Sequence, residues 1–231
     1  GESISNVLTA TTVVGIQDAI DIDYGMTHVC AILSNGDLSC WGHNHQSQLG
    51  IPATYKILTA FVVPGISNVV DVATGDGFTC AVLNSGEVHC MGKNSAYELG
   101  DGTDVQRSTP APVLGITNAV EVVAGRNHAC ARLATGEVTC WGSNGTGQRG
   151  NGTVLNHATT SSIANLVSGL TDASSLAARD YSTCATRSNQ TTVCWGRNSS
   201  GVLGNGYPRY RRLPSRVANI ANAAQVIRTQ V

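Results

Sequence analysis

Cysteine is the most reactive side chain in this sequence, and its eight copies form four pairs with one constant spacing. Nine residues separate the members of each pair, and the first members lie 50, 50 and 54 residues apart. Paired thiols can form disulfides or bind zinc, but zinc sites use closely spaced ligands with further Cys or His nearby. Disulfides are therefore the favoured interpretation, and zinc is the weaker alternative. The pairs are Cys30 with Cys40, Cys80 with Cys90, Cys130 with Cys140 and Cys184 with Cys194.

The residues between paired cysteines predict a β-hairpin. Asn35-Gly36 is a strong signal for a tight turn between two strands, and apolar residues flank it. Folding the chain at this turn brings Cys30 and Cys40 opposite each other, and the other pairs have the same spacing. We therefore predict one disulfide inside each hairpin. Disulfides form in oxidising compartments, so the expected location is extracellular or at the cell surface.

The histidines offer no clear catalytic or metal site. His28 and His128 occupy the same position of a repeat, which favours a structural bond from each imidazole to loop backbone. His43 and His45 are close enough in sequence to bind a metal, but two histidines alone make a poor site. A solvated loop is the favoured interpretation for this pair. We expect no bound metal.

The carboxylates also recur with the repeat, and they are expected to face solvent from strands rather than to form a catalytic pair. No glycine-rich phosphate loop precedes a helix, and no motif places a Ser, His and Asp set. We therefore expect a protein that is not an enzyme and has no cofactor. The recurring carboxylates are Asp21, Asp23, Asp71 and Glu121.

The elements that would position these residues form a tandem repeat. Short β-branched segments end at Gly25, Gly75 and Gly125, and each is followed by a cysteine hairpin and a glycine-rich return. Units of 40 to 50 residues with about four short strands are typical of propeller blades. We predict an all-β, propeller-like array of four-stranded blades in a single repeat domain, 1–231. Its repeats are 1–50, 51–100, 101–150 and 151–204, followed by a partial fifth repeat, 205–231.

The repeat motif resembles a known family. Residues 125–133 read Gly-Arg-Asn-His-Ala-Cys-Ala-Arg-Leu, residues 136–144 read Gly-Glu-Val-Thr-Cys-Trp-Gly-Ser-Asn, and residues 147–153 read Gly-Gln-Arg-Gly-Asn-Gly-Thr. This pattern is similar to the repeat of the regulator of chromosome condensation family, in a cysteine-paired form like that of secreted bacterial members. The resemblance implies a β-propeller. It leaves function open, because propellers of this family serve as nucleotide-exchange factors, enzyme inhibitors and adhesion or scaffold modules.

Four residues and one insertion depart from the family motif. The insertion consists of four extra residues between Gly152 and Gly169, in the fourth repeat. Family propellers close with seven blades, which at this period needs about 350 residues, whereas this chain has 231. The departures are Phe78 and Ser182 in place of His, Met91 in place of Trp, and Arg179 in place of Gly.

Composition excludes several classes of function. The net charge is −1, whereas a protein that binds nucleic acid usually carries an excess of basic residues. No apolar run approaches the roughly 20 residues of a membrane-spanning helix. Arg209, Arg211 and Arg212 are closely spaced, but a solvated turn is the favoured interpretation for them. No signal peptide is recognisable at Gly1, so a mature form is expected.

Two function hypotheses follow. The first is an extracellular, non-enzymatic binding module that presents variable loops to a protein or glycan partner. Four Asn-x-Ser/Thr sites could accept a glycan. The candidate binding-loop residues are His43, His45, Lys93, Tyr97, Arg149 and Arg197. The sites for glycosylation are Asn144, Asn151, Asn189 and Asn198.

The alternative hypothesis is a self-assembling structural subunit. A strand expected from Arg216 to Ile227 would begin a fifth blade and expose an unpaired edge, which natural proteins avoid. A neighbouring copy, or sequence outside this chain, would complete it. Such a head-to-tail contact would build rings or filaments.

Overall fold

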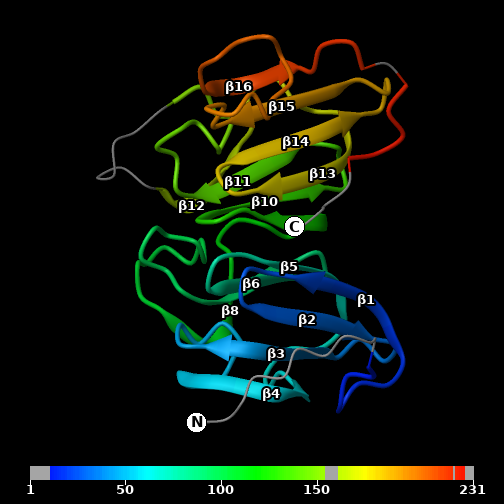
Figure 1. Cartoon of the computed structure of the whole chain (residues 1–231), viewed down its shortest axis with the longest axis vertical. Helices are drawn as coiled ribbons and strands as arrows, with labels where there is room; N and C mark the ends of the chain where they lie inside the picture. The colour runs from blue at the N-terminus through cyan, green and yellow to red at the C-terminus, as the bar shows by residue number, and fades with distance from the viewer. Residues whose placement is uncertain (1–10, 154–160, 221, 227–231) are drawn as a thin grey trace.

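The computed structural model describes residues 11–153, 161–220 and 222–226. These residues form four antiparallel sheets and contain no helix (Figure 1), which confirms the predicted all-β fold class. Each sheet has four strands in consecutive order, and we call the sheets blades 1 to 4.

The blade strands follow the chain without crossovers. Blade 1 contains β1 (Ala19–Tyr24), β2 (His28–Leu33), β3 (Leu38–Asn44) and β4 (Thr54–Val62). Blade 2 contains β5 (Val69–Thr74), β6 (Phe78–Leu83), β7 (Val88–Gly92) and β8 (Arg107–Pro112). Blade 3 contains β9 (Ala119–Ala124), β10 (His128–Leu133), β11 (Val138–Gly142) and β12 (Ser161–Leu166). Blade 4 contains β13 (Ala173–Arg179), β14 (Ser182–Arg187), β15 (Thr192–Gly196) and β16 (Arg211–Arg216).

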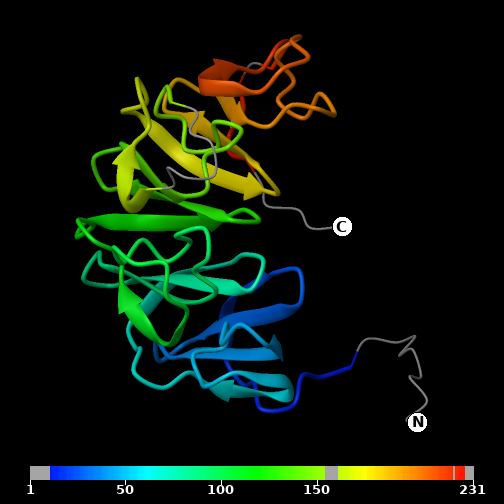
Figure 2. The same cartoon turned by 90° about the vertical axis from the view of Figure 1, so that its left-hand side faces the viewer.

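The blades are arranged in a curved row from blade 1 to blade 4, as Figure 2 shows. The first strands of successive blades are in contact: β1 with β5, β5 with β9, and β9 with β13. Each of the three junctions encloses its own cluster of buried apolar residues. Burial between successive sheets, rather than within one sheet, therefore supplies the core.

Structural blades and sequence repeats are out of phase. β4 falls in the second sequence repeat, yet it pairs with β3 in blade 1, so each blade takes its last strand from the next repeat. β16 completes blade 4 in the same way. The strand predicted from Arg216 to Ile227 is therefore wrong in its described part, because β16 ends at Arg216 and residues 217–220 form a turn. That the whole chain forms one domain stays a prediction.

Residues 222–226 nevertheless make the contacts that lead into a further blade. The Ala223 backbone N–H donates to the Gln190 carbonyl at 3.0 Å, as the Ala173 N–H does to the Gly136 carbonyl at 2.9 Å one blade earlier. The Val226 N–H donates to Ser175 Oγ at 3.1 Å. This segment therefore runs beside β13 where the first strand of a fifth blade would begin.

All eight cysteines are disulfide-bonded across their own hairpins, as predicted, with Cα–Cα distances of 4.0 to 4.1 Å. In each pair the two cysteines occupy directly opposed positions on adjacent strands. Each disulfide closes a short local loop, which on the chain-entropy account adds about 2.5 to 3 kcal/mol. The bonds join Cys30 to Cys40, Cys80 to Cys90, Cys130 to Cys140 and Cys184 to Cys194.

The disulfides of blades 1 to 3 lie at the junctions between blades. Cys30 and Cys40 belong to the buried cluster between blades 1 and 2. Cys80 and Cys90 contribute in the same way to the junction of blades 2 and 3, and the blade 3 pair contributes to the junction with blade 4. The disulfides thus stiffen the surfaces on which neighbouring blades pack.

Two of the three tryptophans of the repeat fill space between neighbouring blades, whereas Trp41 in blade 1 is only partly buried. Trp141 and Trp195 are fully buried, and each indole N–H donates at 2.8 Å to a carbonyl of the preceding blade, Glu98 or Gln148. A Cβ at Gly150 would lie 2.8 Å from Trp195 Nε1. Glycine is required at this position because the ring packs directly on the backbone.

Candidate functional site

Antiparallel pairing sends two loops of every blade to the same end. The turn between the first and second strands and the longer connection between the third and fourth strands meet there, and we call this the loop end. The cysteine hairpin turns lie at the opposite hairpin end, for example around Asn35. Five of the six predicted binding-loop residues are exposed or partly exposed near the loop end; Arg149 is the exception.

A buried asparagine holds each long loop at the loop end. In blade 2 the Asn94 amide donates to the carbonyls of Thr103 at 2.9 Å and Val105 at 3.1 Å, and Asn94 Oδ1 accepts the Leu99 N–H at 3.0 Å. Asn94 thus caps its loop through both ends of its side-chain amide. The same position is Asn44, Asn144 and Asn198 in the other blades.

The neighbouring positions vary while the anchor is constant. One residue before the asparagine, the four blades carry His43, Lys93, Ser143 and Arg197. A rigid anchor beside a variable side chain is the arrangement by which loops on a scaffold recognise partners.

The recurring carboxylates join adjacent blades, which corrects the prediction that they face solvent. Asp71 Oδ2 accepts the Val122 N–H at 2.5 Å, and Glu121 Oε1 accepts the Leu176 N–H at 2.9 Å. Asp23 Oδ2 accepts both the N–H and the hydroxyl of Thr74 at 2.6 Å. Alternation along a strand predicted that these side chains face solvent. That prediction fails because the next blade packs on the same side of the strand and supplies backbone donors. Asp21 is exposed, as predicted.

The repeated histidines also connect blades, but to threonine hydroxyls rather than to the predicted loop backbone. His28 Nε2 lies 2.8 Å from Thr79 Oγ1, and His128 Nε2 lies 2.8 Å from Thr183 Oγ1. Thr79 Oγ1 donates its own proton to the Gln48 carbonyl at 2.8 Å, so it accepts from His28 and the Nε2–H tautomer is defined. Nδ1 of each histidine is buried without a partner among the described residues.

Burial lowers the pKa of both histidines. The pKa of His28 falls to about 3 and that of His128 to about 4, because the imidazolium would lose its hydration. Each ring is therefore neutral at physiological pH. Neither can act as an acid or base toward solvent, which agrees with the structural role predicted for them.

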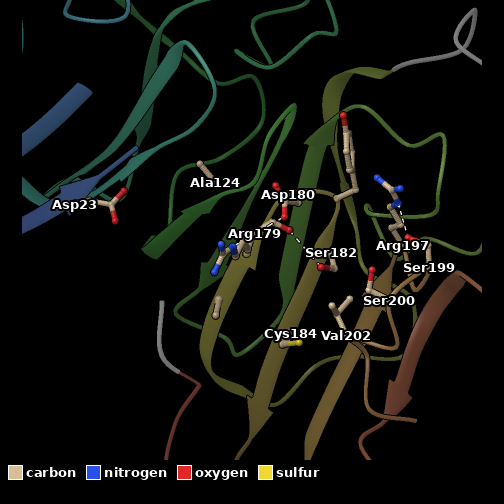
Figure 3. A pocket seen from close by; sticks show the side chains of 13 residues that line it. Asp23, Ala124, Arg179, Asp180, Ser182, Cys184, Arg197, Ser199, Ser200 and Val202 are labelled. Carbon is tan, nitrogen blue, oxygen red and sulfur yellow. Dashed lines mark hydrogen bonds and ion pairs between the residues drawn. The ribbon is translucent and has the colours of Figure 1, made fainter. Parts of the chain in front are cut away.

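A cavity of about 620 Å³ opens at the loop end of blade 4 (Figure 3). It is formed by the end of β13, the β13–β14 turn and the loop between β15 and β16, with Asp23 and Ala124 at its far side. A smaller hollow of about 280 Å³ adjoins it and shares four lining residues. The polar residues of the larger cavity are Asp23, Arg179, Asp180, Tyr181, Ser182, Arg197, Ser199 and Ser200.

Tyr181 organises the arginines around the cavity. The guanidinium carbons of Arg126 and Arg197 lie 5.9 and 5.5 Å from its ring centroid. Arg197 Nε also donates to Ser199 Oγ at 2.9 Å, and Arg126 pairs with Asp76 at 3.1 Å. Cation–π contacts and these polar bonds orient the side chains before any ligand arrives. Arg126 and Tyr181 were not predicted from sequence.

The other predicted loop residues are spread over blades 1 and 2. His43 and His45 form an aromatic cluster with Tyr55, with ring centroids 5.1 to 5.6 Å apart. Lys93 pairs with buried Glu98 at 3.2 Å, and Tyr97 adopts a left-handed backbone with φ of 63°. The described residues contain no group of three or more His, Cys, Asp or Glu side chains suited to a metal ion. They also contain no helix long and apolar enough to cross a membrane.

Arg149 is not a binding-loop residue. Its side chain is buried, its Nη2 donates to Asn165 Oδ1, and its Nε and Nη1 have no partner within the described part of the chain. Burial lowers its pKa. The equivalent residues in the other blades are Leu49, Leu99 and Leu203, and all three are fully buried. Aligning the repeats places Arg149 at this leucine position, which is the sequence signal that could have corrected the prediction.

Two of the four predicted glycosylation sites are wrong, because their side chains are buried. Asn144 and Asn198 are 1% and 2% exposed, and both ends of each amide are hydrogen-bonded as loop anchors. A glycan has no room at either position in the folded protein. Asn189 is exposed and Asn151 partly exposed, and glycosylation there stays a prediction.

Four-stranded blades joined in a curved row define the chain as a β-propeller-type repeat protein. The family model described as the regulator of chromosome condensation (RCC1) repeat matches residues 19–48, 69–98 and 119–148, and a second RCC1 model matches residues 85–132. The chain thus carries regulator of chromosome condensation repeats, as its motifs predicted.

Solved structures support the fold. Human WBSCR16 is 21% identical, with a TM-score of 0.78 over 88% of this chain and 55% of its own length. Prp20p of Saccharomyces cerevisiae, the yeast RCC1, is 19% identical, with a TM-score of 0.79 over 90% of this chain and 52% of its own. The chain spans about half the length of these proteins. A comparison with curated protein sequences finds no match.

Proposed function

We propose that this chain is an extracellular, non-enzymatic binding module that holds a protein partner at the loop end of its blades. The observation that carries the proposal is the contrast at the loop end between one constant, buried asparagine and a different neighbouring side chain in each blade. Four disulfides support an oxidising environment. The protein-binding role of regulator of chromosome condensation propellers points the same way.

A photo-cross-linking residue placed at one end of a blade tests this function. Gly145 is exposed at the loop end of blade 3, and an added Cβ there meets no atom within 4 Å. Ala134 is exposed at the hairpin end of the same blade and is the matched control. We expect irradiation with the extracellular proteins of the source cells to yield a defined adduct from position 145 and none from position 134. Equal labelling from both positions would refute a loop-end site.

Self-assembly is the second candidate, and the exposed face of blade 1 favours it. Ile22 is 59% exposed, whereas its equivalents Val72, Val122 and Leu176 are at most 1% exposed against a preceding blade. A second copy could cover this face. However, residues 223–226 already lie beside β13, so the incoming β1 would have to displace them. A cross-linking residue at Ile22 would join two copies of the chain if this candidate is correct.

A further inference from the structure

Blade 4 differs from the other blades by a compensated exchange of two residues. A Cβ at Gly125 would lie 2.2 Å from His128 Cε1, and a Cβ at Gly75 would lie 2.0 Å from Phe78 Cε1. In blades 2 and 3 a side chain at the first position of this turn would therefore clash with the large residue three positions later, whereas in blade 1 a Cβ at Gly25 would lie 3.1 Å from His28 Cε1. Blade 4 changes both together: Arg179 replaces the glycine, and Ser182 replaces the large residue.

The larger cavity lies beside this exchange, and both Arg179 and Ser182 line it. In blade 1 the ring of His28 lies beside Thr79, the residue that also contacts Cys30 Sγ at 4.0 Å and the Gln48 carbonyl. The blade 4 equivalents of Cys30 and Gln48 are Cys184 and Val202, and both line the cavity. The hollow therefore lies on the face of blade 4 that corresponds to the face of blade 1 on which blade 2 packs, at the position where blades 1 to 3 carry a histidine or phenylalanine.

Blade 4 also concentrates the positive charge of the protein. Residues 173–216 contain seven arginines and one acidic residue, Asp180, for a net charge of +6. The whole chain carries −1, so the remaining residues carry −7. Five of the seven arginines lie at the loop end or on strand ends next to it: Arg179, Arg197, Arg209, Arg211 and Arg212.

Tyrosines accompany these arginines. The Arg211 guanidinium lies 4.0 Å from the ring centroid of Tyr207, and that of Arg212 lies 5.8 Å from Tyr210. Tyr207 is 61% exposed and Tyr210 is 39% exposed. Arginine and tyrosine are the residues enriched at the energetic centres of protein interfaces. Arg211 and Arg212, two of the three closely spaced arginines predicted to lie in a solvated turn, instead begin β16 and form part of an Arg/Tyr surface.

We propose that the loop end of blade 4 binds an acidic peptide segment of the protein partner, with one carboxylate side chain entering the cavity near Arg179 and Arg197. This inference rests on the proposed binding function and names the chemistry of the partner. Guanidinium groups bind carboxylates through paired, charge-assisted hydrogen bonds, and the hydroxyls of Ser199 and Ser200 add donors.

The negative charges of the nearby acidic side chains are partly compensated by other groups. Asp23 accepts two hydrogen bonds from Thr74, Asp76 pairs with Arg126, and exposed Asp180 lies 4.0 Å from Arg179 Nε. A nucleic-acid ligand is disfavoured because the rest of the chain, at −7, would repel a long polyanion. A short acidic peptide needs only blade 4.

Fluorescence anisotropy of labelled peptides tests the proposal. Fluorescein-labelled hexaglutamate should bind the oxidised chain and lose affinity between 0.1 and 0.5 M salt, because salt screens exposed charges. Hexaglutamine, the uncharged control, should not bind. The double variant Arg179→Gly/Ser182→His restores the repeat residues, removes one of the two arginines proposed to bind the carboxylate and should weaken hexaglutamate binding about tenfold or more.

Arg216→Gln is the matched control, since it removes one exposed positive charge at the hairpin end of the same blade. It should change the affinity by no more than about twofold. Thermal unfolding of each variant checks that the fold is intact. Binding unaffected by the double variant, equal binding of hexaglutamine, or tighter binding of a hexathymidine oligonucleotide would overturn the proposal. If hexaglutamate fails while position 145 still yields its adduct, only this inference falls; loss of the adduct removes the proposed function itself.

Discussion

Lowering the pH from 7 to 5 should reduce the free energy of unfolding by about 4 kcal/mol through two buried histidines. In the unfolded chain a histidine has a pKa of about 6.5, whereas in the folded protein His28 has a pKa of about 3 and His128 of about 4. Below pH 6.5 the unfolded state therefore binds protons that the folded state does not. Below pH 6.5 each histidine lowers the free energy of unfolding by about 1.4 kcal/mol per pH unit, which amounts to about 2 kcal/mol at pH 5.

Chemical denaturation at pH 7, 6 and 5 measures this loss. Blade 2 supplies the control, because Phe78 occupies the same position and cannot titrate. The double variant His28→Phe/His128→Phe should lose most of the pH dependence over this range. Thr79 would keep its bond to the Gln48 carbonyl in that variant. An equal loss of stability in the variant and the parent chain would show that other groups cause the acid sensitivity.

Replacing Arg149 by leucine should raise the free energy of unfolding by about 2 kcal/mol. The buried guanidinium has two nitrogens without partners in the described structure, and no acidic side chain pairs with it there. The equivalent leucine in each of the other three blades is fully buried, so the position accommodates the replacement. The gain is reduced because Asn165 loses its bond to Arg149.

Denaturant unfolding at pH 7 gives the free energy for Arg149→Leu. Arg197→Leu is the matched control, since it makes the same chemical change at an exposed site and should stay within about 0.5 kcal/mol of the parent. A stability loss in Arg149→Leu would mean that the guanidinium is paired in solution. That result would return Arg149 to the list of functional candidates.

Features encoded in local sequence were predictable. The hairpin around Asn35-Gly36 and the spacing of Cys30 and Cys40 lie within one short segment, and the asparagine anchors act within their own loops. Packing between blades was predictable only for the tryptophans, because a large ring in a repeated position has few other places to go.

Features that depend on neighbouring blades could not be read in the same way. Strand alternation assigns Asp71 and Glu121 to a solvent face, but the next blade supplies backbone donors to both. The phase of the blades depends on pairing across repeat boundaries, as between β3 and β4. Arg179 and Ser182 were visible as separate departures from the motif, whereas their link appears only when the Cβ clash at Gly125 is known.

The oxidation state of the cysteines in the source cells tests the proposed extracellular, disulfide-stapled module most directly. Protein recovered after acid quenching and treated with iodoacetamide without reduction should carry no alkylated cysteine, and peptide mapping should recover Cys30 with Cys40 and the three equivalent pairs. The same sample should gain eight alkyl groups after reduction, because the chain contains eight cysteines. Alkylation of all eight before reduction would place the chain in a reducing compartment and contradict the account.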